Sequence, residues 1–264
     1  MYLTRFRVNS ARPGARRLLG SPQRLHAAVM SSFPGLLPSD GPGTTGTSAD
    51  GPRVLWRIDH RARAEVLLYV VSPARPDLTH LVEQAGWPAL ADPETPGWET
   101  RPYAPFLDRL TAGSRWSFRL TANPVHTIRR TDDEPKKLTA HRTPIHQMGW
   151  LLKRQKDAGF QIVEKPATDR LLPGGTTYKS KTEHHGDQYE LTVGDLRARA
   201  FDKSGRSAPS GRKSQPVTLV TVTFEGRLEV TDPALLRRTL TQGIGRAKAY
   251  GCGLLTLAPV ARTA

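Results

Sequence analysis

The sequence predicts an α+β fold in which the order strand, helix, strand, strand, helix, strand occurs twice. Alternating apolar segments indicate strands, and apolar residues three or four positions apart indicate helices. A capping residue followed by proline marks three predicted helix starts, at Ser21, Thr143 and Asp232. With 264 residues, 37% of them apolar, the chain is long enough for two domains with their own cores.

The first half begins with an alternating strand and continues into a helix capped by Ser21. Leu25, Val29 and Phe33 follow at the spacing of one buried helix face, and Pro34 ends the helix. Prolines are frequent from 88 to 105, which indicates a linker. The predicted elements are strand 2–9, helix 22–33, strands 54–59 and 64–72, and helix 78–85.

The second half repeats this order. Its longest predicted strand alternates clearly, with Val220, Val222, Phe224, Leu228 and Val230 on one face. The predicted elements are strand 115–121, a helix from 144 towards 159, strands 160–163, 191–200 and 217–230, a helix from 233, and strand 254–257. The repeated order is that of a ferredoxin-like (RRM-like) βαββαβ domain. We therefore expect one domain at 1–95, a linker at 96–112 and a second domain at 113–264.

The charge balance favours a polyanionic partner. Lys and Arg number 39 against 24 Asp and Glu, which gives a formal net charge of +15. No apolar run reaches the roughly 18 residues of a membrane span, and the N-terminal segment lacks the apolar core of a signal peptide. The single cysteine, Cys252, excludes an internal disulfide and a cysteine-based zinc site. We expect a cytoplasmic, nucleic-acid-binding protein without membrane attachment, metal or cofactor.

A glycine-rich segment, GIGRAKAYGCG at 243–253, lies between the last predicted helix and strand. It has neither the spacing of a Walker A loop nor the strand-to-helix setting of a dinucleotide-binding loop. One interpretation is a backbone that approaches phosphates closely, helped by Arg246 and Lys248. The other is a tight helix-to-strand connection with a glycine C-cap. The residues alone leave both open.

Continued to Pro259, this segment resembles the C-terminal glycine-rich signature of the CasE family of CRISPR-associated endoribonucleases. Three further segments are similar to the family in the same order: MYLTRFRVN at the start, FRLTANP at 118–124 and FEGRL at 224–228. The resemblance implies two ferredoxin-like domains that bind CRISPR repeat RNA and cut it at the base of its stem-loop. It also implies that the product stays bound and that the protein joins the multi-subunit Cascade complex.

His26 is the candidate catalytic residue. RNA can be cut without metal when its own 2′-hydroxyl attacks the phosphate, and histidine can move the proton at neutral pH. His26 lies about 100° from Leu25 around the predicted helix, at the margin of the apolar face. Position alone favours a boundary histidine without a task. The resemblance implies that the catalytic histidine is in this helix.

One departure from the family concerns the residue one turn earlier. Family members commonly carry tyrosine three residues before the histidine, where this chain has Gln23. Glutamine donates hydrogen bonds but exchanges no proton near neutral pH. We predict His26, Gln23 and Arg24 as the catalytic set. The assisting group is left open among Arg24, Arg16, Arg17, Lys248 and Tyr250.

Two basic groups are candidates for gripping RNA. A-form duplex is recognised mainly by shape and backbone charge, which suits arginine and lysine, although a solvated loop would have the same composition. The first basic group lies around the loop between the two long predicted strands, at 197–213. The second contains Arg129, Arg130, Lys136, Lys137 and Arg142. The predicted RNA-binding residues are Arg197, Arg199, Lys203, Arg206, Arg212, Lys213, Gly243, Gly245, Arg246, Lys248, Gly251 and Gly253.

Other interpretations remain. His184 and His185 are adjacent, so their side chains diverge, and no partner pair stands at zinc spacing. His126, His141 and His146 lie near basic residues and could face RNA. A non-catalytic RNA-hairpin-binding subunit is the main alternative function. A base-stacking RRM is disfavoured because its aromatic strand motif is absent, and a basic ribosomal protein because long lysine-rich tails are absent.

Overall fold

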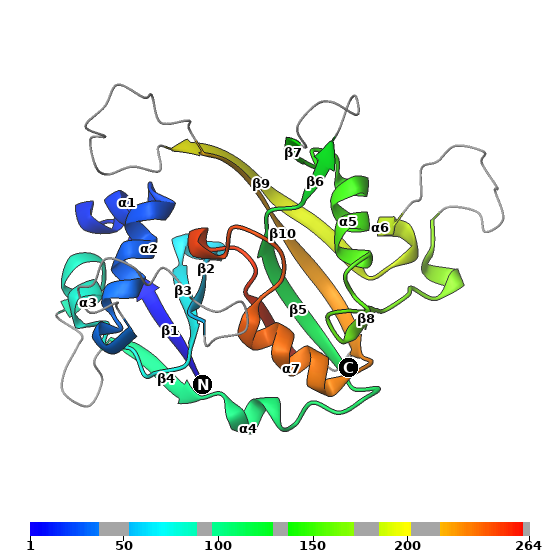
Figure 1. The fold of residues 1–264 in the computed structure, drawn as a ribbon, viewed down its shortest axis with the longest axis horizontal. Helices are drawn as coiled ribbons and strands as arrows, with labels where there is room; N and C mark the ends of the chain where they lie inside the picture. Colours follow the sequence, from blue (N-terminus) through cyan, green and yellow to red (C-terminus); the bar gives the residue numbers. More distant parts are fainter. Residues whose placement is uncertain (37–52, 89–96, 129–136, 172–184, 202–216, 261–264) are drawn as a thin grey trace.

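The structure is a computed structural model that describes residues 1–36, 53–88, 97–128, 137–171, 185–201 and 217–260. Two antiparallel sheets, each with helices packed on it, form the body of the molecule (Figure 1). Among the described residues, no helix is both long and apolar enough to cross a bilayer.

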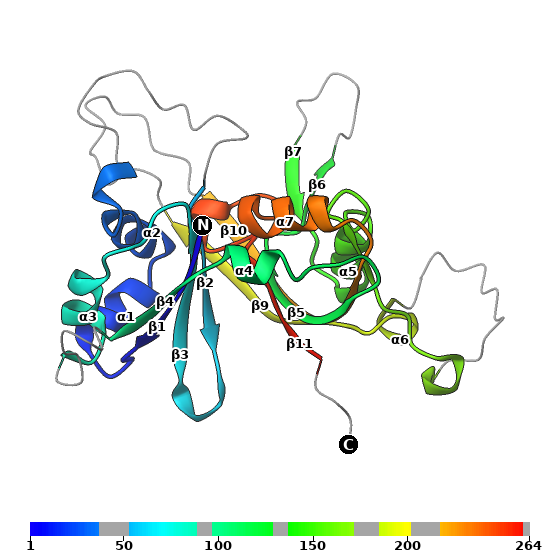
Figure 2. The ribbon, with the colours of Figure 1, turned by 90° about the horizontal axis from the view of Figure 1, so that it is seen from below.

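The first sheet has the strand order β2-β3-β1-β4, with every neighbouring pair antiparallel. This is the order that a βαββαβ unit produces, so the predicted ferredoxin-like fold is confirmed for this half. Its helices lie on one side of the sheet (Figure 2). The elements are β1 Tyr2–Val8, α1 Pro13–Leu19, α2 Pro22–Ser31, η1 Pro34–Leu36, β2 Leu55–His60, η2 Ala62–Ala64, β3 Val66–Ser72, α3 Thr79–Ala85 and β4 Trp98–Pro102.

The second sheet repeats this topology in the order β11-β5-β10-β8. Strand β9 pairs with the outer part of β10, and a separate two-stranded ribbon, β6–β7, follows β5. The elements are α4 Ala104–Leu107, β5 Arg115–Ala122, β6 Val125–Ile128, β7 Lys137–Ala140, α5 Pro144–Leu152, β8 Phe160–Ile162, η4 Ala167–Asp169, α6 His185–Gln188, β9 Leu191–Phe201, β10 Val217–Val230, α7 Pro233–Gln242, η5 Lys248–Tyr250 and β11 Leu255–Pro259.

The three cap-then-proline signals each start a helix. The Ser21 hydroxyl accepts a bond from the Arg24 N–H at 3.3 Å, and the Asp232 carboxylate accepts from Ala234 and Leu235 at 2.8 and 3.0 Å. The Thr143 side chain makes no such cap and instead hydrogen-bonds His146 Nδ1 at 2.6 Å. The helix it begins ends at Leu152, because residues 153–159 form turns rather than the expected continuation.

Two buried clusters hold the molecule together. One lies between the first sheet and its helices and includes Phe6, Val29 and Leu81. The other centres on the second sheet but also takes in Leu55 and Val71 from the first sheet. The first sheet is therefore buried on both faces, and its second face is covered by the other half of the chain.

Several elements were not predicted, among them β4, α1, the β6–β7 ribbon and the short helices α4 and α6. Strand β4 lies inside the range 96–112 expected as linker, and it pairs with β1 at the sheet edge. Helix α1 buries only Ala15 and Leu18, and the β6–β7 ribbon is largely solvent-facing, so neither carries a strong apolar pattern. The division into domains at 1–95 and 113–264 stays a prediction, which limited proteolysis can test.

Candidate nucleic-acid interface

Helix α2 lies where the two halves of the chain meet. It packs against η5 of the glycine-rich segment, and a hollow opens on each side of it. The interdomain cavity is lined by Leu19, Pro22, Leu25, Trp56, Ile58, His60, Arg119, Thr121, Asp195, Arg197, Arg199, Leu219, Thr221, Thr223, Tyr250 and Gly251. The cationic groove is lined by Arg16, Arg17, Gly20, Ser21, Gln23, Arg24, Ala27 and Phe201.

His26 lies on the helix face between these two hollows. At about 100° per residue, it is about 40° around α2 from Pro22, which lines the cavity, and about 60° from Gln23, which lines the groove. Its side chain is half-buried, and its buried Nδ1 has no hydrogen-bond partner among the described residues. Burial lowers the pKa of His26, so the imidazole is neutral at neutral pH and can accept a proton.

The groups left open as assistants to His26 all gather around α2. Arg16, Arg17 and Arg24 line the cationic groove beside Gln23, whereas Tyr250 lines the cavity. Lys248 is half-buried in η5, and burial first, then the nearby charge of Arg53, lowers its pKa. The groove can therefore bind an anion through its arginines. The lysine of η5 loses its ammonium proton more easily than an ordinary lysine.

The glycine-rich segment packs into the domain boundary. Gly243, Gly245, Gly251 and Gly253 all have φ between 75° and 87°, which only glycine adopts without strain. A Cβ at Gly251 would lie 2.6 Å from the Trp56 ring, and one at Gly253 would lie 2.7 Å from a backbone carbonyl. The tight-connection interpretation therefore accounts for the glycines. Arg246 is exposed, and contact of the segment with RNA remains a prediction.

Arg197 and Arg199 on β9 both reach the first half of the chain. Arg197 Nη1 lies 3.1 Å from His60 Nε2, and Arg199 Nη1 donates to the Leu19 carbonyl at 3.4 Å. Burial, followed by the charge of Arg197, lowers the pKa of Arg199. Both residues line the interdomain cavity, so two half-enclosed cations face the same space. The predicted RNA-binding residues Lys203, Arg206, Arg212 and Lys213 lie outside the described residues.

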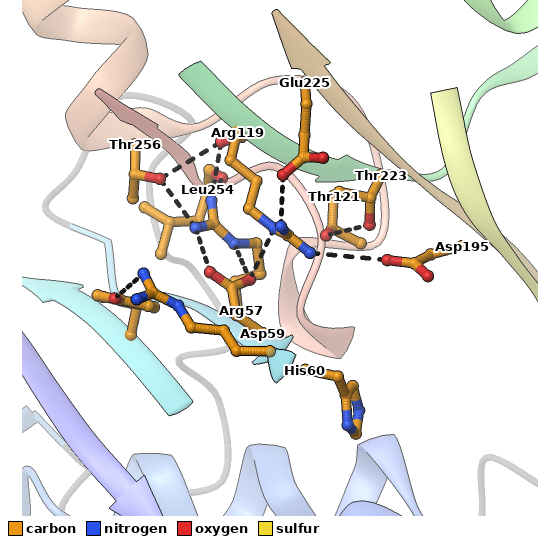
Figure 3. Close-up of polar contacts among 12 residues, drawn as sticks. Arg57, Asp59, His60, Arg119, Thr121, Asp195, Thr223, Glu225, Leu254 and Thr256 are labelled. Atoms are coloured by element: carbon orange, nitrogen blue, oxygen red, sulfur yellow. Dashed lines mark hydrogen bonds and ion pairs between the residues drawn. The ribbon is translucent and has the colours of Figure 1, made fainter. Parts of the chain in front are cut away.

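A network of charged residues crosses the domain boundary (Figure 3). Arg57 and Asp59 on β2 form a buried bidentate pair, with N–O distances of 2.7 and 2.9 Å. Arg57 also donates to the carbonyls of Arg119 and Leu254, at 2.8 and 2.9 Å, and to the Thr256 hydroxyl at 2.8 Å. These contacts fix β2 against β5 and β11.

Arg119 extends this network towards β9. Its Nε lies 3.3 Å from Asp59, its Nη2 lies 3.6 Å from Asp195, and its Nη1 pairs with Glu225. Asp195 is two residues before Arg197. The network therefore runs from the buried centre of the domain boundary to the strand that carries the basic residues.

Sequence reasoning missed the Arg57 network and His60. A signal was present, because Leu55, Arg57 and Asp59 alternate on one face of a strand whose apolar members predict burial. Two opposite charges on such a face indicate an ion pair that needs partners from another element.

The remaining histidines that the structure describes form no recognisable metal site. The described residues contain no cluster of three or more His, Cys, Asp or Glu arranged to hold an ion, and His184 lies outside them. The His126, His141 and His146 rings stack with centroids 4.3 and 5.9 Å apart between β6 and α5. Lys137 and Arg142 line a groove with Arg246, whereas Arg129, Arg130 and Lys136 lie outside the described residues.

Two ferredoxin-like domains with cationic hollows at their boundary have the architecture of a nucleic-acid-binding protein. The chain belongs to the family described as CRISPR associated protein, whose sequence profile matches residues 1–259. This match, together with similarity to the named relatives Cse3 and CasE, confirms the resemblance to the CasE family.

Relatives extend the comparison. The chain is 30% identical to the CRISPR-associated endoribonuclease Cse3 of Thermus thermophilus, over 98% of this chain and all of that one. It is 29% identical to the CRISPR system Cascade subunit CasE of Escherichia coli, over 58% of this chain and 62% of that one. A structure of Thermus thermophilus Cse3 bound to an RNA representing a pre-cleavage complex matches 98% of each chain, with a TM-score of 0.64 and 25% identity.

Proposed function

We propose that this protein is an endoribonuclease that binds the stem-loop of CRISPR repeat RNA and cuts at the base of the stem. The RNA 2′-hydroxyl is the nucleophile, no metal takes part, and the product stays bound within a Cascade complex in the cytoplasm. The observation that carries the proposal is the position of His26, a neutral, half-buried imidazole between the interdomain cavity and the cationic groove. The named activity of the Cse3 relative supports it.

In this mechanism His26 acts as the general base. Its neutral imidazole takes the proton of the 2′-hydroxyl, whose oxygen then attacks the adjacent phosphorus. The bond to the 5′-oxygen breaks, and the product ends in a 2′,3′-cyclic phosphate. Arginines of the groove stabilise the charge that develops on the phosphate oxygens. The leaving 5′-oxygen needs a proton, for which half-buried Lys248 and Tyr250 are the candidates in η5.

Binding of the stem uses charge rather than base recognition. Two cationic surfaces lie on either side of His26, one formed by Arg197 and Arg199 of β9 and the other by Arg16, Arg17 and Arg24 of α1 and α2. When the phosphates of an RNA stem contact both cationic surfaces, the lower end of the stem lies at α2. Retention of the product follows from the same contacts, because cleavage removes none of the phosphates in the stem.

A non-catalytic hairpin-binding subunit is the second candidate. Gln23 favours it, since this side chain lines the groove where the family commonly has a titratable tyrosine. Such a protein would bind the repeat hairpin as tightly and leave it intact.

Cleavage of a repeat hairpin in excess chelator tests the proposal. We expect a cyclic-phosphate end on the product and full activity without divalent metal. A 2′-deoxy substitution at the cut site should stop cleavage and spare binding. Chelator-sensitive cleavage, or cleavage of the deoxy substrate, would contradict the mechanism, and binding of an uncut natural hairpin would favour the second candidate.

A further inference from the structure

Strand β9 is tied to the first half of the chain through two arginines whose partners differ in kind. Arg197 contacts the His60 imidazole at 3.1 Å, whereas Arg199 donates to the backbone carbonyl of Leu19. Side chains two residues apart in a strand share a face, so both guanidinium groups point the same way. Only the partner of Arg197 can change its charge.

The contact fixes the protonation state of His60. A guanidinium has N–H donors and no acceptor, so His60 Nε2 must accept. This requires a neutral imidazole with its proton on Nδ1. Burial and then the charge of Arg197 lower the pKa of His60, and Arg199 adds to this, while Asp195 and Asp59 act in the opposite direction. The accepting form is thus the one present at neutral pH.

The surrounding charges do not favour a second cation at this position. Both nearby carboxylates already face other arginines, because Asp59 pairs with Arg57 and Asp195 faces Arg119. A protonated His60 would lie against Arg197 with Arg199 close by, and its Nε2 could no longer accept. The charged groups that act on His60 are Asp59 of β2 and Asp195, Arg197 and Arg199 of β9. Arg119 of β5 and Tyr250 of η5 line the same cavity.

We propose that His60 is a positioning residue for RNA: its neutral imidazole holds the Arg197 guanidinium at the interdomain cavity, with the remaining N–H groups free to bind an RNA phosphate beside α2. This inference rests on the proposed RNA-binding function. It has a consequence for pH. Protonation of His60 releases Arg197, so RNA affinity falls as the pH drops through the pKa of His60.

His60→Ala and His60→Gln separate positioning from a general effect of mutation. Glutamine accepts a hydrogen bond through its side-chain oxygen but cannot titrate. Dissociation constants are measured for a repeat hairpin with a 2′-deoxy cut site, at about pH 8 and about pH 5, because burial and Arg197 lower the pKa of His60 below the ordinary histidine value. At the higher pH we expect His60→Ala to bind roughly 3- to 10-fold more weakly, as for a lost hydrogen bond, and His60→Gln to match the parent within about 2-fold.

The pH comparison carries the sharper test. Relative to His60→Gln, the parent should lose affinity on going to the lower pH. Arg197→Ala should abolish the difference between the parent and His60→Gln, because the residues are coupled. Arg199→Ala is the matched control: it removes the same charge from the same strand face, yet the pH difference should persist.

Two outcomes would overturn the inference. If the parent binds the hairpin more tightly than His60→Gln at the lower pH, protonated His60 contacts a phosphate directly. Additive effects of His60→Ala and Arg197→Ala would show that neither positions the other. In both cases the parent still binds and cuts the hairpin, so the proposed function stands. A parent that does not bind the hairpin refutes the proposed function, and the role of His60 with it.

Discussion

At the residue scale, the proposed chemistry depends on the protonation state of His26. Burial lowers its pKa from the ordinary value of 6.5. A general base is active when neutral, so the cleavage rate should rise with pH through that lowered pKa and level off by about pH 7. A rate that instead falls over this range would assign His26 the role of general acid.

His26→Ala should slow single-turnover cleavage by about 10²–10⁴-fold, the usual contribution of a placed proton-transfer group. Hairpin affinity should change little, because a neutral imidazole adds little to the electrostatic binding of a protein of net charge +15. Arg5→Ala, at an exposed arginine of β1 that pairs with Glu99, serves as the control and should cut at the parental rate. Parental cleavage by His26→Ala would mean that the active site lies elsewhere.

Gln23→Tyr tests the departure from the family at the residue one turn before His26. Gln23 lines the cationic groove beside Arg24, so a tyrosine there would present its hydroxyl to the same space. If this is the family's tyrosine position, single-turnover cleavage should be preserved or faster. A large loss of rate, with hairpin affinity unchanged, would show that the groove uses another partner, such as Arg24.

At the element scale, β9 carries the predicted grip on RNA. Replacing Arg197 and Arg199 by alanine should weaken hairpin binding and flatten its salt dependence. Each lost phosphate contact should reduce the slope of log affinity against log salt by about 0.7–0.9. Arg115→Ala is a matched control, since this exposed arginine of β5 already pairs with Glu229. Equal slopes for the parent and the β9 variant would show that Arg197 and Arg199 face solvent and contact no phosphate.

Helices and strands were predictable where a long apolar periodicity in the sequence matches the burial of the same residues in the fold. In β10, Val222, Phe224, Leu228 and Val230 alternate in sequence and are buried in the structure. Strand β4 is different, because it is exposed along most of its length and owes its place to pairing with β1. A short polar edge strand has no periodic signal, so only the folded partner reveals it.

The site was predictable in part for a similar reason. The residues alone place His26 at the margin of a helix, and only the family resemblance gives it a task. The cationic groove joins Arg16 and Arg17 of α1 to Arg24 of α2 and Phe201 of β9, and α1 was not predicted. The contact of His60 with Arg197 spans 137 residues of sequence, and no local pattern encodes such a distance.

At the scale of the whole molecule, the orientation of the two halves decides whether α2 and β9 face one RNA. Two features fix it. The glycine-rich segment packs Gly251 against Trp56 so closely that a Cβ would collide with the ring. The Arg57 network joins β2 to β5 and β11 through buried charge. The proposed active surface is therefore a property of the domain boundary and not of either domain alone.

Arg57→Ala tests that boundary. Both partners of the Arg57–Asp59 pair are at most 3% exposed, so removing the arginine takes the bidentate partner from a buried carboxylate, which keeps only the Arg119 Nε at 3.3 Å. The free energy of unfolding in urea should fall by about 3–5 kcal/mol. Arg5→Ala provides the control, because Arg5 and Glu99 form an ion pair that is about half exposed, and its loss should cost less than about 1 kcal/mol.

Replacing both partners, Arg57→Leu with Asp59→Leu, should be less destabilising than Arg57→Ala, since no buried charge remains unpaired. Recovery should be partial, because the carbonyls of Arg119 and Leu254 still lose their donor. The double variant should also cut the hairpin more slowly than its stability alone explains, as the two cationic surfaces lose their fixed relative position. If Arg57→Ala unfolds at the same urea concentration as Arg5→Ala, the pair is not buried in solution and the boundary is held by apolar packing alone.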